Sequence, residues 1–346
     1  MFLLLFTFYF VIYLGKENAV IIVLSKNDEL EKILKCLNTF ERMFNSKYRY
    51  PYVFFNDSEF SEEYKNKIRD VISSTVEFGL LSSEEWGVPG FIDNEKMFKK
   101  IREMKKKNIK YGGLLSYRKM CRFYSGFFYR NELVAKYDYY WRIEPDIEFF
   151  CEIKYDPFLF VKNTNKKYGF VISVIEIMET VPTLWNAVSD FIEVYDKKYP
   201  NYKMKERMKN IKNKDKDGDN YKDDYGNLRF VTDGHGFNGC HFWSNFEIAA
   251  FDFFRSKIYS DFFNFLDRKG GFFYERWGDA PIHSIAVSLF LKKNEIHFFG
   301  DIGYYHPPVT YCPSFKQNSL CKCDREKSFN YKRKTCLDKL EIKQYL

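Results

Sequence analysis

Several motifs of common protein classes are missing from this sequence. No Gly-x-Gly-x-x-Gly follows the first hydrophobic strand-like run, Ala19 to Leu24, so a dinucleotide site of the usual kind is not expected. No nucleic-acid-binding motif accompanies the net charge of +8, and carboxylates are interspersed among the basic residues, which argues against a nucleic-acid partner. Asp215 to Asp219 begins like a calcium-binding loop, but Asn220 stands where that loop requires glycine, and its twelfth position carries no glutamate.

Charged side chains are absent from Met1 to Leu14, which consists mostly of Phe, Leu, Tyr and Val. A membrane span needs about 20 apolar residues, so this run fits the hydrophobic region of a signal peptide better. A short signal-anchor stays open because Gly15 to Leu24 is only lightly charged, and a buried strand is the third alternative. We expect residues 1–18 to direct the chain into the secretory pathway, as a signal peptide or an anchor that contacts the membrane.

An even number of cysteines in a lumenal protein suggests disulfides, although the sequence leaves their pairing open. Cys321-Lys322-Cys323 resembles part of a zinc cluster, but the Cys-x-Cys spacing is poor for a zinc knuckle. We therefore expect disulfides that involve a Cys- and Lys-rich C-terminal tail over residues 313–346. The eight cysteines are Cys36, Cys121, Cys151, Cys240, Cys312, Cys321, Cys323 and Cys336.

The first part of the chain has the strand–helix–strand order that begins a doubly wound sheet. Ala19 to Leu24 is continuously apolar, Glu29 to Phe44 has apolar residues at helical spacing, and Tyr52 to Phe55 forms a second strand. Further strands are predicted over Val76 to Leu81, Tyr168 to Val174 and Ile296 to Phe299. Further helices are predicted over Glu62 to Ile72, Glu95 to Ile109, Ser116 to Phe128, Pro182 to Tyr195, from about Ile248, and over Ile285 to Leu291.

One large α/β domain over residues 19–312 accounts for this length and for an apolar fraction of 45%. Residues 203–227 interrupt it with a segment rich in Lys, Asn and Asp. Such a composition cannot support a core, so this segment is predicted to be a mobile surface loop.

An aromatic, strand-like run from Tyr137 ends in Glu144-Pro145-Asp146. Proline lacks a backbone N–H and marks the strand end, and alternation lets Glu144 and Asp146 point the same way. Two hard oxygen donors suit a divalent cation that also holds a diphosphate, and ligands usually bind at strand ends in open α/β sheets. Acid-Pro-acid alone is weak, because short acidic tripeptides are common in solvated turns.

Other polar residues stand out from apolar surroundings. Glu247 lies in an aromatic run, where a lone carboxylate costs free energy unless it is used or paired. Lys26, at the end of the first strand, is either a phosphate or nucleotide contact or a solvated loop lysine. His306 lies in an aromatic, proline-containing loop, where a structural role is the more common one for a lone histidine.

Five blocks resemble the fungal α-1,2-mannosyltransferases of glycosyltransferase family 15: Ser116 to Tyr129, Tyr139 to Asp146, Cys240 to Ala249, Gly270 to His283 and Ile296 to His306. Their order and context match from about Ala19 to Cys312. The resemblance implies a GT-A-type, Rossmann-like mixed sheet flanked by helices in a single large domain. It also implies a GDP-mannose donor, a divalent metal, usually Mn2+, and retention at the anomeric carbon.

The same resemblance implies roles for individual residues. Glu144, Asp146 and His306 take the places of the metal-contacting residues. Glu247 matches a nucleophile or cation-stabilising carboxylate, and Asp279 an acid beside the reacting sugars. The donor- and substrate-binding positions are Tyr117, Lys26, Arg142 and Trp277, although the family often has arginine where Lys26 stands.

The implied reaction is transfer of mannose to the 2-hydroxyl of an α-linked mannose on O-linked or N-linked glycans of glycoproteins. The implied location is the Golgi lumen, as a type II membrane protein or a processed soluble form, although the tail and stem common in the family are nearly absent. The alternative is a sugar-binding homologue without turnover. Every acid and the histidine of the family pattern are present, which favours an active enzyme.

Overall fold

The computed structural model describes residues 16–217, 227–331 and 335–340. Most of the N-terminal hydrophobic segment, predicted to be a signal peptide or an anchor, lies outside these residues. Within them, no helix has both the length and the apolar character needed to cross a membrane.

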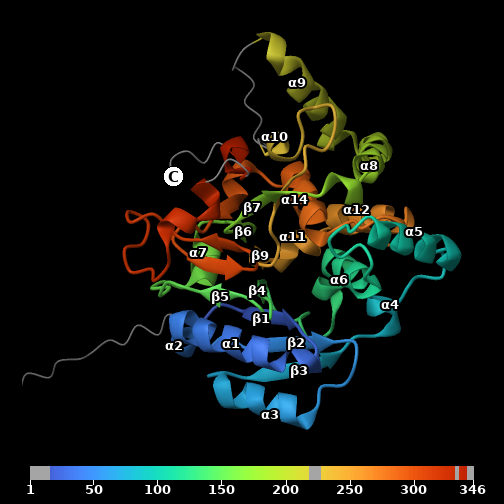
Figure 1. Cartoon of the computed structure of the whole chain (residues 1–346). Helices are drawn as coiled ribbons and strands as arrows, with labels where there is room; N and C mark the ends of the chain where they lie inside the picture. Colours follow the sequence, from blue (N-terminus) through green and yellow to red (C-terminus); the bar gives the residue numbers. More distant parts are fainter. Residues whose placement is uncertain (1–15, 218–226, 332–334, 341–346) are drawn as a thin grey trace, which may run out of the picture.

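A seven-stranded mixed sheet forms the centre of the molecule, in the order β10-β6-β9-β4-β1-β2-β3 (Figure 1). β9 is antiparallel to its neighbours β4 and β6, whereas the other neighbouring pairs are parallel. This arrangement confirms the predicted α/β class. The strands are β1 (Ala19–Leu24), β2 (Tyr52–Asn56), β3 (Val76–Leu80), β4 (Tyr139–Ile143), β6 (Tyr168–Phe170), β9 (Glu247–Ala250) and β10 (Ile296–Phe298).

Parallel pairing brings the ends of β1, β2 and β4 to one edge of this sheet. Val23 lies opposite Ile143, and Leu24 lies opposite Phe55, so the residues that follow these strands are neighbours. A second sheet, β5 (Glu148–Phe149), β11 (Tyr304–His306) and β12 (Val309–Tyr311), begins just after β4 and brings His306 to the same edge. A third pairs β7 (Ser173–Ile175) with β8 (Cys240–Phe242).

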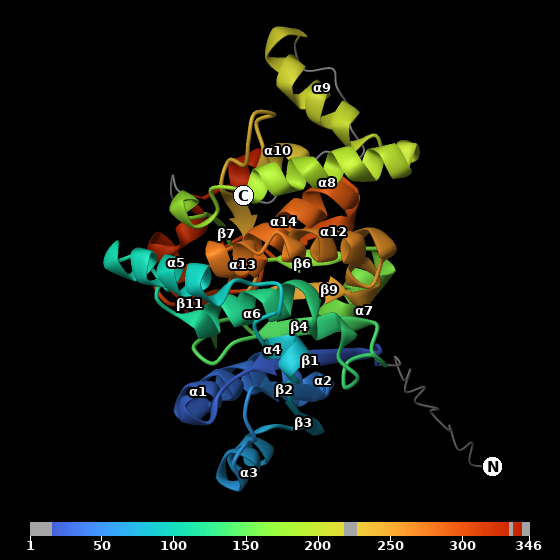
Figure 2. The same cartoon turned by 90° about the vertical axis from the view of Figure 1, so that its right-hand side faces the viewer.

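Helices cover the sheet, and α8 and α9 lie at one end of the molecule in two perpendicular views (Figures 1 and 2). α14 is mostly apolar and is buried along almost its whole length, as expected for a core helix. The helices are α1 (Leu30–Phe40), α2 (Ser46–Tyr48), α3 (Glu62–Val71), α4 (Ser83–Trp86), α5 (Asn94–Lys106), α6 (Leu115–Gly126), α7 (Pro157–Asn163), α8 (Leu184–Lys198), α9 (Met204–Asp217), α10 (Leu228–Val231), α11 (Phe251–Phe254), α12 (Lys257–Arg268), α13 (Gly271–Tyr274) and α14 (Asp279–Phe290).

Aromatic side chains fill much of the core, which explains their high share of the sequence. The Trp141 ring lies 4.9 Å from the Phe40 ring, edge to face, and 5.3 Å from the Phe246 ring. These geometries are favourable for aromatic pairs and add to the burial of apolar area. β4 is therefore anchored on one face by rings from α1 and from the segment before β9.

Two predicted elements near the centre of the chain differ from the structure. The helix predicted from about Ile248 is wrong, because Glu247–Ala250 is strand β9 and helix α11 begins only at Phe251. A short apolar run buried on both faces has no periodicity that separates strand from helix. The single strand predicted over Tyr168 to Val174 is divided into β6 and β7, which belong to different sheets.

The prediction of a loop over residues 203–227 is wrong for its first part, which forms helix α9 (Figure 2). Met204, Arg207 and Ile211 are buried and recur at helical spacing, so a sparse packing face is present within a polar sequence. The Arg207 Nη1 group donates to the Leu289 carbonyl at 2.9 Å, which ties α9 to the end of α14. Residues 218–226 of the predicted loop lie outside the described residues.

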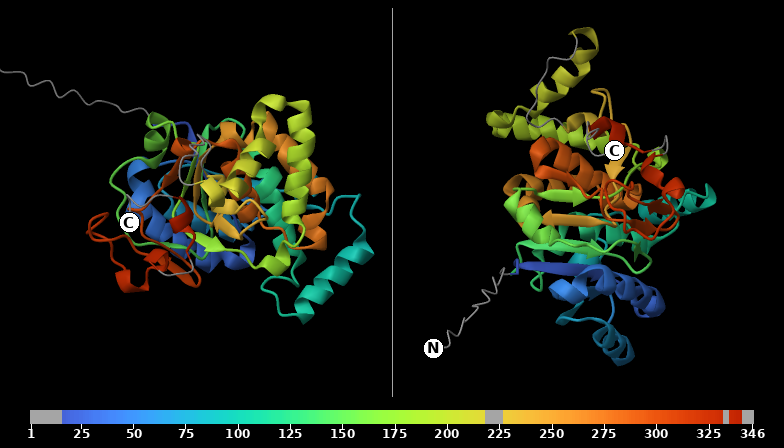
Figure 3. Two further views of the ribbon diagram at one scale, coloured as in Figure 1. Left: turned by 90° about the horizontal axis from the view of Figure 1, so that it is seen from above. Right: turned by 90° about the vertical axis from the view of Figure 1, so that its left-hand side faces the viewer.

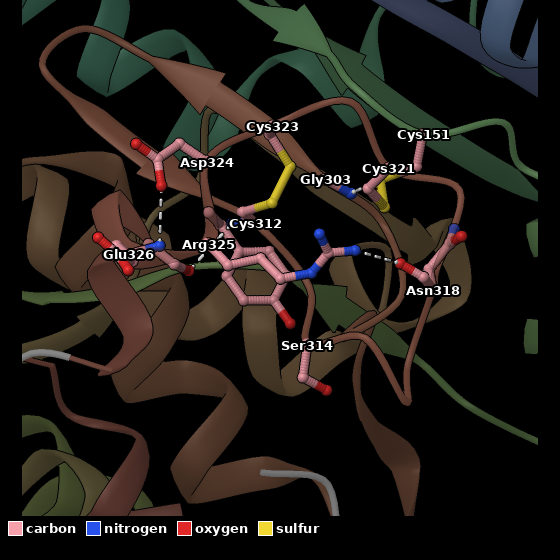
Figure 4. Close-up of a disulfide and its surroundings, with 12 residues drawn as sticks. Cys151, Gly303, Cys312, Ser314, Asn318, Cys321, Cys323, Asp324, Arg325 and Glu326 are labelled. Atoms are coloured by element: carbon pink, nitrogen blue, oxygen red, sulfur yellow. Dashed lines mark hydrogen bonds between the residues drawn. A yellow bond between two sulfur atoms is a disulfide. The ribbon is translucent and has the colours of Figure 1, made fainter.

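Three disulfides connect the C-terminal segment to the sheets: Cys240–Cys336 and, as Figure 4 shows, Cys151–Cys321 and Cys312–Cys323. The prediction of disulfides is confirmed, and the zinc alternative is excluded because these thiols are paired. Cys36 and Cys121 are free and buried. The Gly303 N–H donates to the Cys151 sulfur at 3.0 Å, so the first disulfide lies against the residue that precedes β11.

Close packing of α6 on α12 leads to the first prediction. A Cβ added at Gly126 would lie 2.0 Å from the Phe263 ring, whereas one added at Gly90 would meet nothing within 4 Å. Gly126→Ala is therefore expected to lower the free energy of unfolding by about 1–3 kcal/mol, as overpacked cores do. Gly90→Ala is the matched control, with an expected change of less than about 1 kcal/mol. Urea unfolding of both variants measures the difference, and equal stabilities would contradict this account of the α6–α12 contact.

Candidate active site

A cleft of about 490 Å³ lies at the edge where β1, β2 and β4 end. Seven of the nine residues predicted to form the site line it: Lys26, Tyr117, Arg142, Glu144, Asp146, Asp279 and His306. The remaining two, Glu247 and Trp277, are not among its lining residues in the part of the chain that the structure describes. The structure thus brings together side chains from five separate regions of the sequence.

Glu144, Asp146 and His306 form a cluster with the spacing of a metal site. One potential ligand atom from each lies within 4.8 Å of the others. The His306 Nε2 atom is 3.2 Å from a Glu144 oxygen and 3.6 Å from an Asp146 oxygen. Two carboxylates and one imidazole are a donor set that suits Mn2+.

The electrostatic surroundings keep this cluster charged. Burial alone would raise the pKa of the Glu144 carboxyl, but the Arg142 guanidinium and His306 overcome it and lower that pKa to about 2. Burial alone would lower the pKa of His306, but the hydrogen bond to Glu144 and the charges of Glu144 and Asp146 raise it. The Glu144 carboxyl is therefore ionised at neutral pH.

Arg142 connects the metal-type cluster to the other end of the cleft. Its side chain is 3% exposed, and its Nη1 group donates to the Asp279 Oδ2 atom at 2.6 Å. Its Nη2 group donates to Glu144, and its guanidinium lies 3.5 Å from the centre of the Tyr124 ring. Lysine cannot reproduce these contacts, because only a planar guanidinium can donate to two carboxylates in fixed directions and also stack on an aromatic ring.

Asp279 is the first residue of α14, where the partial positive charge of a helix N-terminus favours an anion. Its Oδ2 atom accepts from Arg142 and, at 2.7 Å, from the Ser244 hydroxyl. Burial would raise the pKa of this carboxyl, but Arg142, His283 and the Ser244 hydroxyl hold it below its usual value. Asp279 is thus a fixed, ionised hydrogen-bond acceptor in the cleft wall.

Glu247 lies beneath the cleft, enclosed by donors. Its side chain is 1% exposed and accepts hydrogen bonds from the hydroxyls of Tyr140 and, at 2.6 Å, Tyr168. His283, one turn after Asp279 in α14, contacts Glu247 at 2.8 Å through Nδ1 and the Tyr124 carbonyl at 2.9 Å through Nε2. Paired in this way, a carboxylate in an aromatic core is not left unsatisfied.

Both contacts of the His283 ring are with acceptors, so the ring donates to both only when it is doubly protonated. Burial lowers the pKa of His283, but the charge and hydrogen bond of Glu247 outweigh burial and raise it. The sequence did not reveal this pair, because its members come from a strand and a helix 36 residues apart.

Trp277 is a core residue. Its ring occupies the space where a Cβ of Gly271 would lie, and its Nε1 group donates to Glu275 at 2.6 Å. The predicted substrate contact therefore has no support in the position of this side chain, which is 1% exposed. Tyr117, in contrast, lines the cleft and stacks on Tyr111, with ring centres 4.6 Å apart.

Glu176 and Arg276 are cleft residues that sequence reasoning missed. They form an ion pair at 3.1 Å, and the Arg276 guanidinium lies 5.1 Å from the Tyr117 ring centre. Arg276 lies within the Gly270 to His283 block that the sequence singled out, but nothing near Glu176 distinguished it from a solvated loop acid. Lys26 is exposed at the other end of the cleft, near Asn56 and Asp57.

Comparison with known families gives one match over nearly the whole chain. The glycolipid 2-alpha-mannosyltransferase family matches residues 12–344. The O-glycoside alpha-1,2-mannosyltransferase Omh1 of Schizosaccharomyces pombe is 45% identical over 325 residues, which cover 94% of this chain and 78% of that protein. The alpha-1,2 mannosyltransferase KTR1 of Saccharomyces cerevisiae is 45% identical over 329 residues, with the same two coverages.

Solved structures of similar proteins share the fold. Core-mannan synthase A of Aspergillus fumigatus, in an Mn/GDP form, superposes with a TM-score of 0.83 at 34% identity, covering 96% of this chain and 86% of that one. The mannosyltransferase Ktr4p of Saccharomyces cerevisiae, in complex with GDP, gives a TM-score of 0.83 at 36% identity and covers 96% and 82%. The predicted GT-A-type fold is thereby confirmed.

The protonated state of His283 leads to the second prediction. Because the folded-state pKa is raised, the contribution of this ring to stability is complete below about pH 6.5 and is lost as pH rises through the folded value. The stability difference between the wild type and His283→Gln should therefore shrink over the pH range above about 6.5, by at most about 1.5–3 kcal/mol, the contribution of one charged hydrogen bond. Urea unfolding across this range measures it.

His297 supplies a control, because its pKa is shifted in the opposite direction. Burial lowers the pKa of His297 to about 4, so its protonation destabilises the fold only as pH falls below about 6.5. The difference between the wild type and His297→Gln should stay constant above pH 7. A constant difference for His283→Gln as well would contradict the doubly protonated ring.

Proposed function

This chain belongs to the glycolipid 2-alpha-mannosyltransferase family, glycosyltransferase family 15, and from that premise we propose how its side chains carry out mannosyl transfer. The chain is a retaining, metal-dependent α-1,2-mannosyltransferase that moves mannose from GDP-mannose to the 2-hydroxyl of an α-linked mannose. The observation that carries the proposal is the cleft in which a Mn2+-type donor set and an ionised aspartate are joined by one buried arginine.

Glu144, Asp146 and His306 are the proposed ligands of Mn2+. Their three potential ligand atoms already lie together, their donor chemistry suits this ion, and Asp146 is 40% exposed toward solvent. Bound Mn2+ supplies Lewis-acid stabilisation of the negative charge that develops on the departing diphosphate. Arg142 orients Glu144 for this role and holds it ionised.

The nucleotide end of the donor site is proposed to lie near Lys26, Asn56 and Asp57. Lys26 follows β1, Asn56 ends β2 and Asp57 follows it, so all three lie at the sheet edge where nucleotide ligands bind in open α/β folds. The Lys26 ammonium is exposed and lies near enough to the cleft to meet phosphate charge. Tyr117, which lines the cleft next to Arg276, is proposed to contact the transferred mannose.

Asp279 is the proposed acidic group beside the reacting sugars. Because Arg142 keeps the pKa of Asp279 low, this carboxylate is suited to accept hydrogen bonds from sugar hydroxyls and to stabilise positive charge at the anomeric carbon. It is poorly suited to take a proton at neutral pH. The proton of the acceptor hydroxyl is therefore proposed to pass to the leaving phosphate.

Glu247 is proposed to position α14 rather than to attack the sugar. Three donors already occupy this carboxylate, which is 1% exposed, and one of them is His283, in the same helix as Asp279. A nucleophile requires an open path to the anomeric carbon. Retention is therefore proposed to proceed by attack of the acceptor on the face from which the diphosphate departs.

The acceptor is proposed to be an α-linked mannose on O-linked or N-linked glycans of glycoproteins, and the location is proposed to be the Golgi lumen. Three disulfides support an oxidising compartment. Residues 1–18 are proposed to direct the chain there, residues 19–312 to form the catalytic domain, and residues 313–346 to brace it through the disulfides. Membrane contact through the N-terminal segment belongs to the same proposal.

Transfer from GDP-mannose to methyl α-mannoside, with and without Mn2+, tests the function. An α-1,2 disaccharide that forms only with Mn2+, identified by NMR, is the expected result. GDP binding without transfer would favour the alternative of a sugar-binding homologue. Absence of GDP binding would overturn this interpretation of the cleft.

His306 leads to the third prediction. His306→Ala removes one of three proposed ligands, so the Mn2+ concentration that gives half-maximal activity should rise at least tenfold, as for lost contacts around metal sites. His235→Ala, an exposed histidine outside the cleft lining, should leave it unchanged. Titration of activity with Mn2+ separates the two, and equal curves would rule out His306 as a ligand.

The two carboxylates of the fourth prediction should behave differently. Asp279→Asn removes charge that faces the reacting centre, and kcat should fall by about 10²–10³-fold, as for other electrostatic stabilisers. Glu247→Gln should lower stability together with kcat, because it weakens the contact that holds α14. Mass spectrometry of the wild type with donor alone should find no glycosyl adduct at Glu247, and such an adduct would restore the nucleophile interpretation.

A further inference from the structure

A second cleft, of about 420 Å³, opens between α5 and the body of the molecule. α5 lies at one flank, next to α13, where Figures 2 and 3 show it at the edge of the fold. The proposed mechanism uses none of the residues that line this cleft. Its polar lining residues are Lys96, Lys100, Glu103, Lys107, Glu179, Thr183, Lys269, Tyr274 and Glu275.

Three segments of the chain run directly from the wall of this cleft into the wall of the active-site cleft. Ile109 lines the second cleft and the next residue, Lys110, lines the first; Glu275 and Arg276 do the same on another wall. On the third wall, Ile177 lines the first cleft and Glu179 the second. Because consecutive Cα atoms are about 3.8 Å apart, the two linings come within one or two residues of each other on all three segments, and the clefts adjoin there.

Exposed apolar side chains lie at this junction. Tyr111, Leu114 and Ile177 line the first cleft on the side of the second and are 40%, 49% and 37% exposed. Tyr111 has a φ of 58°, a left-handed conformation that is unusual for a bulky residue and that clusters at ligand sites. Its ring is held by the stack on Tyr117. Apolar faces of sugar rings pack well on such a surface.

The second cleft offers both hydrogen-bond donors and acceptors with little net charge. Four lysines and three glutamates line it, and some already interact: Lys100 with Glu103 at 2.9 Å, and the Thr183 hydroxyl with Glu275 at 2.7 Å. The Lys96 ammonium lies 4.2 Å from the Tyr274 ring centre. Because the charges nearly balance, this lining suits a neutral chain rich in hydroxyls better than an anionic polymer.

We propose that the second cleft is a subsite for the inner sugars of an oligomannosyl acceptor, whose terminal mannose receives the new residue in the first cleft. The sugars between the two would cross the apolar rim of Tyr111, Leu114 and Ile177. This inference rests on the proposed mannosyltransferase function. It specifies the acceptor as a glycan of several mannoses rather than a single sugar.

Acceptor length tests the proposal. The wild-type chain is assayed with GDP-mannose, Mn2+ and methyl glycosides of α-1,2-linked mannose, mannobiose, mannotriose and mannotetraose. The expected kcat/KM rises about tenfold from the shortest to the longest acceptor, the effect of about one added hydrogen bond to a charged group. The double variant Glu179→Gln/Lys107→Gln should lose this rise and keep its activity on methyl α-mannoside, because both side chains are exposed and lie outside the first cleft.

A matched variant controls for the loss of one acid and one base. Glu63→Gln/Lys67→Gln changes an exposed pair on α3, which lies away from α5 at the end of the molecule opposite α9 (Figure 1), and should keep the full rise with length. A rise that persists in the Glu179/Lys107 variant, or an equal kcat/KM for all acceptors in the wild type, would overturn the subsite alone. Failure of the wild type to use any acceptor would overturn the proposed function as well.

Discussion

The guanidinium of Arg142 is the interaction on which the cleft depends. A buried cation needs partners, and this one has Glu144 on one side, Asp279 on the other and the Tyr124 ring across its face. The same contacts keep both carboxylates ionised despite their burial. One side chain thus connects the proposed metal-binding end of the cleft to its proposed sugar-binding end, and it keeps a carboxylate ionised at each.

Beneath this layer, the pair of Glu247 and His283 holds α14 against the sheet. In the register of β4 and β9, Glu247 lies directly opposite Arg142. The antiparallel strand β9 therefore places one carboxylate under the cleft, while β4 places the arginine in it. Removal of charge at Glu247 would act on Asp279 through α14, which carries both His283 and Asp279. This connection, together with the burial of Glu247, is why we propose a positioning role for it.

The predictable part of the molecule follows from local patterns. The buried run of β1, the amphipathic α1 and the acid-Pro-acid end of β4 have signals within a few residues, and the structure has them in place. The part that was not predictable depends on pairing over long distances. Glu176 with Arg276, and Glu247 with His283, become neighbours only after the sheet has formed, and β9 is too short to reveal its own conformation. His306 and Asp279 entered the site only through the family resemblance.

The long sequence separation between the proposed metal ligands also explains why the C-terminal segment matters for the site. His306 lies 162 residues after Glu144, so the third proposed metal ligand is positioned by tertiary structure alone. β11, which carries it, pairs with β5 immediately after Asp146. The Cys151–Cys321 and Cys312–Cys323 disulfides close the segments on either side of this small sheet, and Cys151 accepts a hydrogen bond from Gly303 just before β11 (Figure 4). Cross-links between distant segments reduce the freedom of the unfolded chain, so they favour the one arrangement in which the three ligands meet.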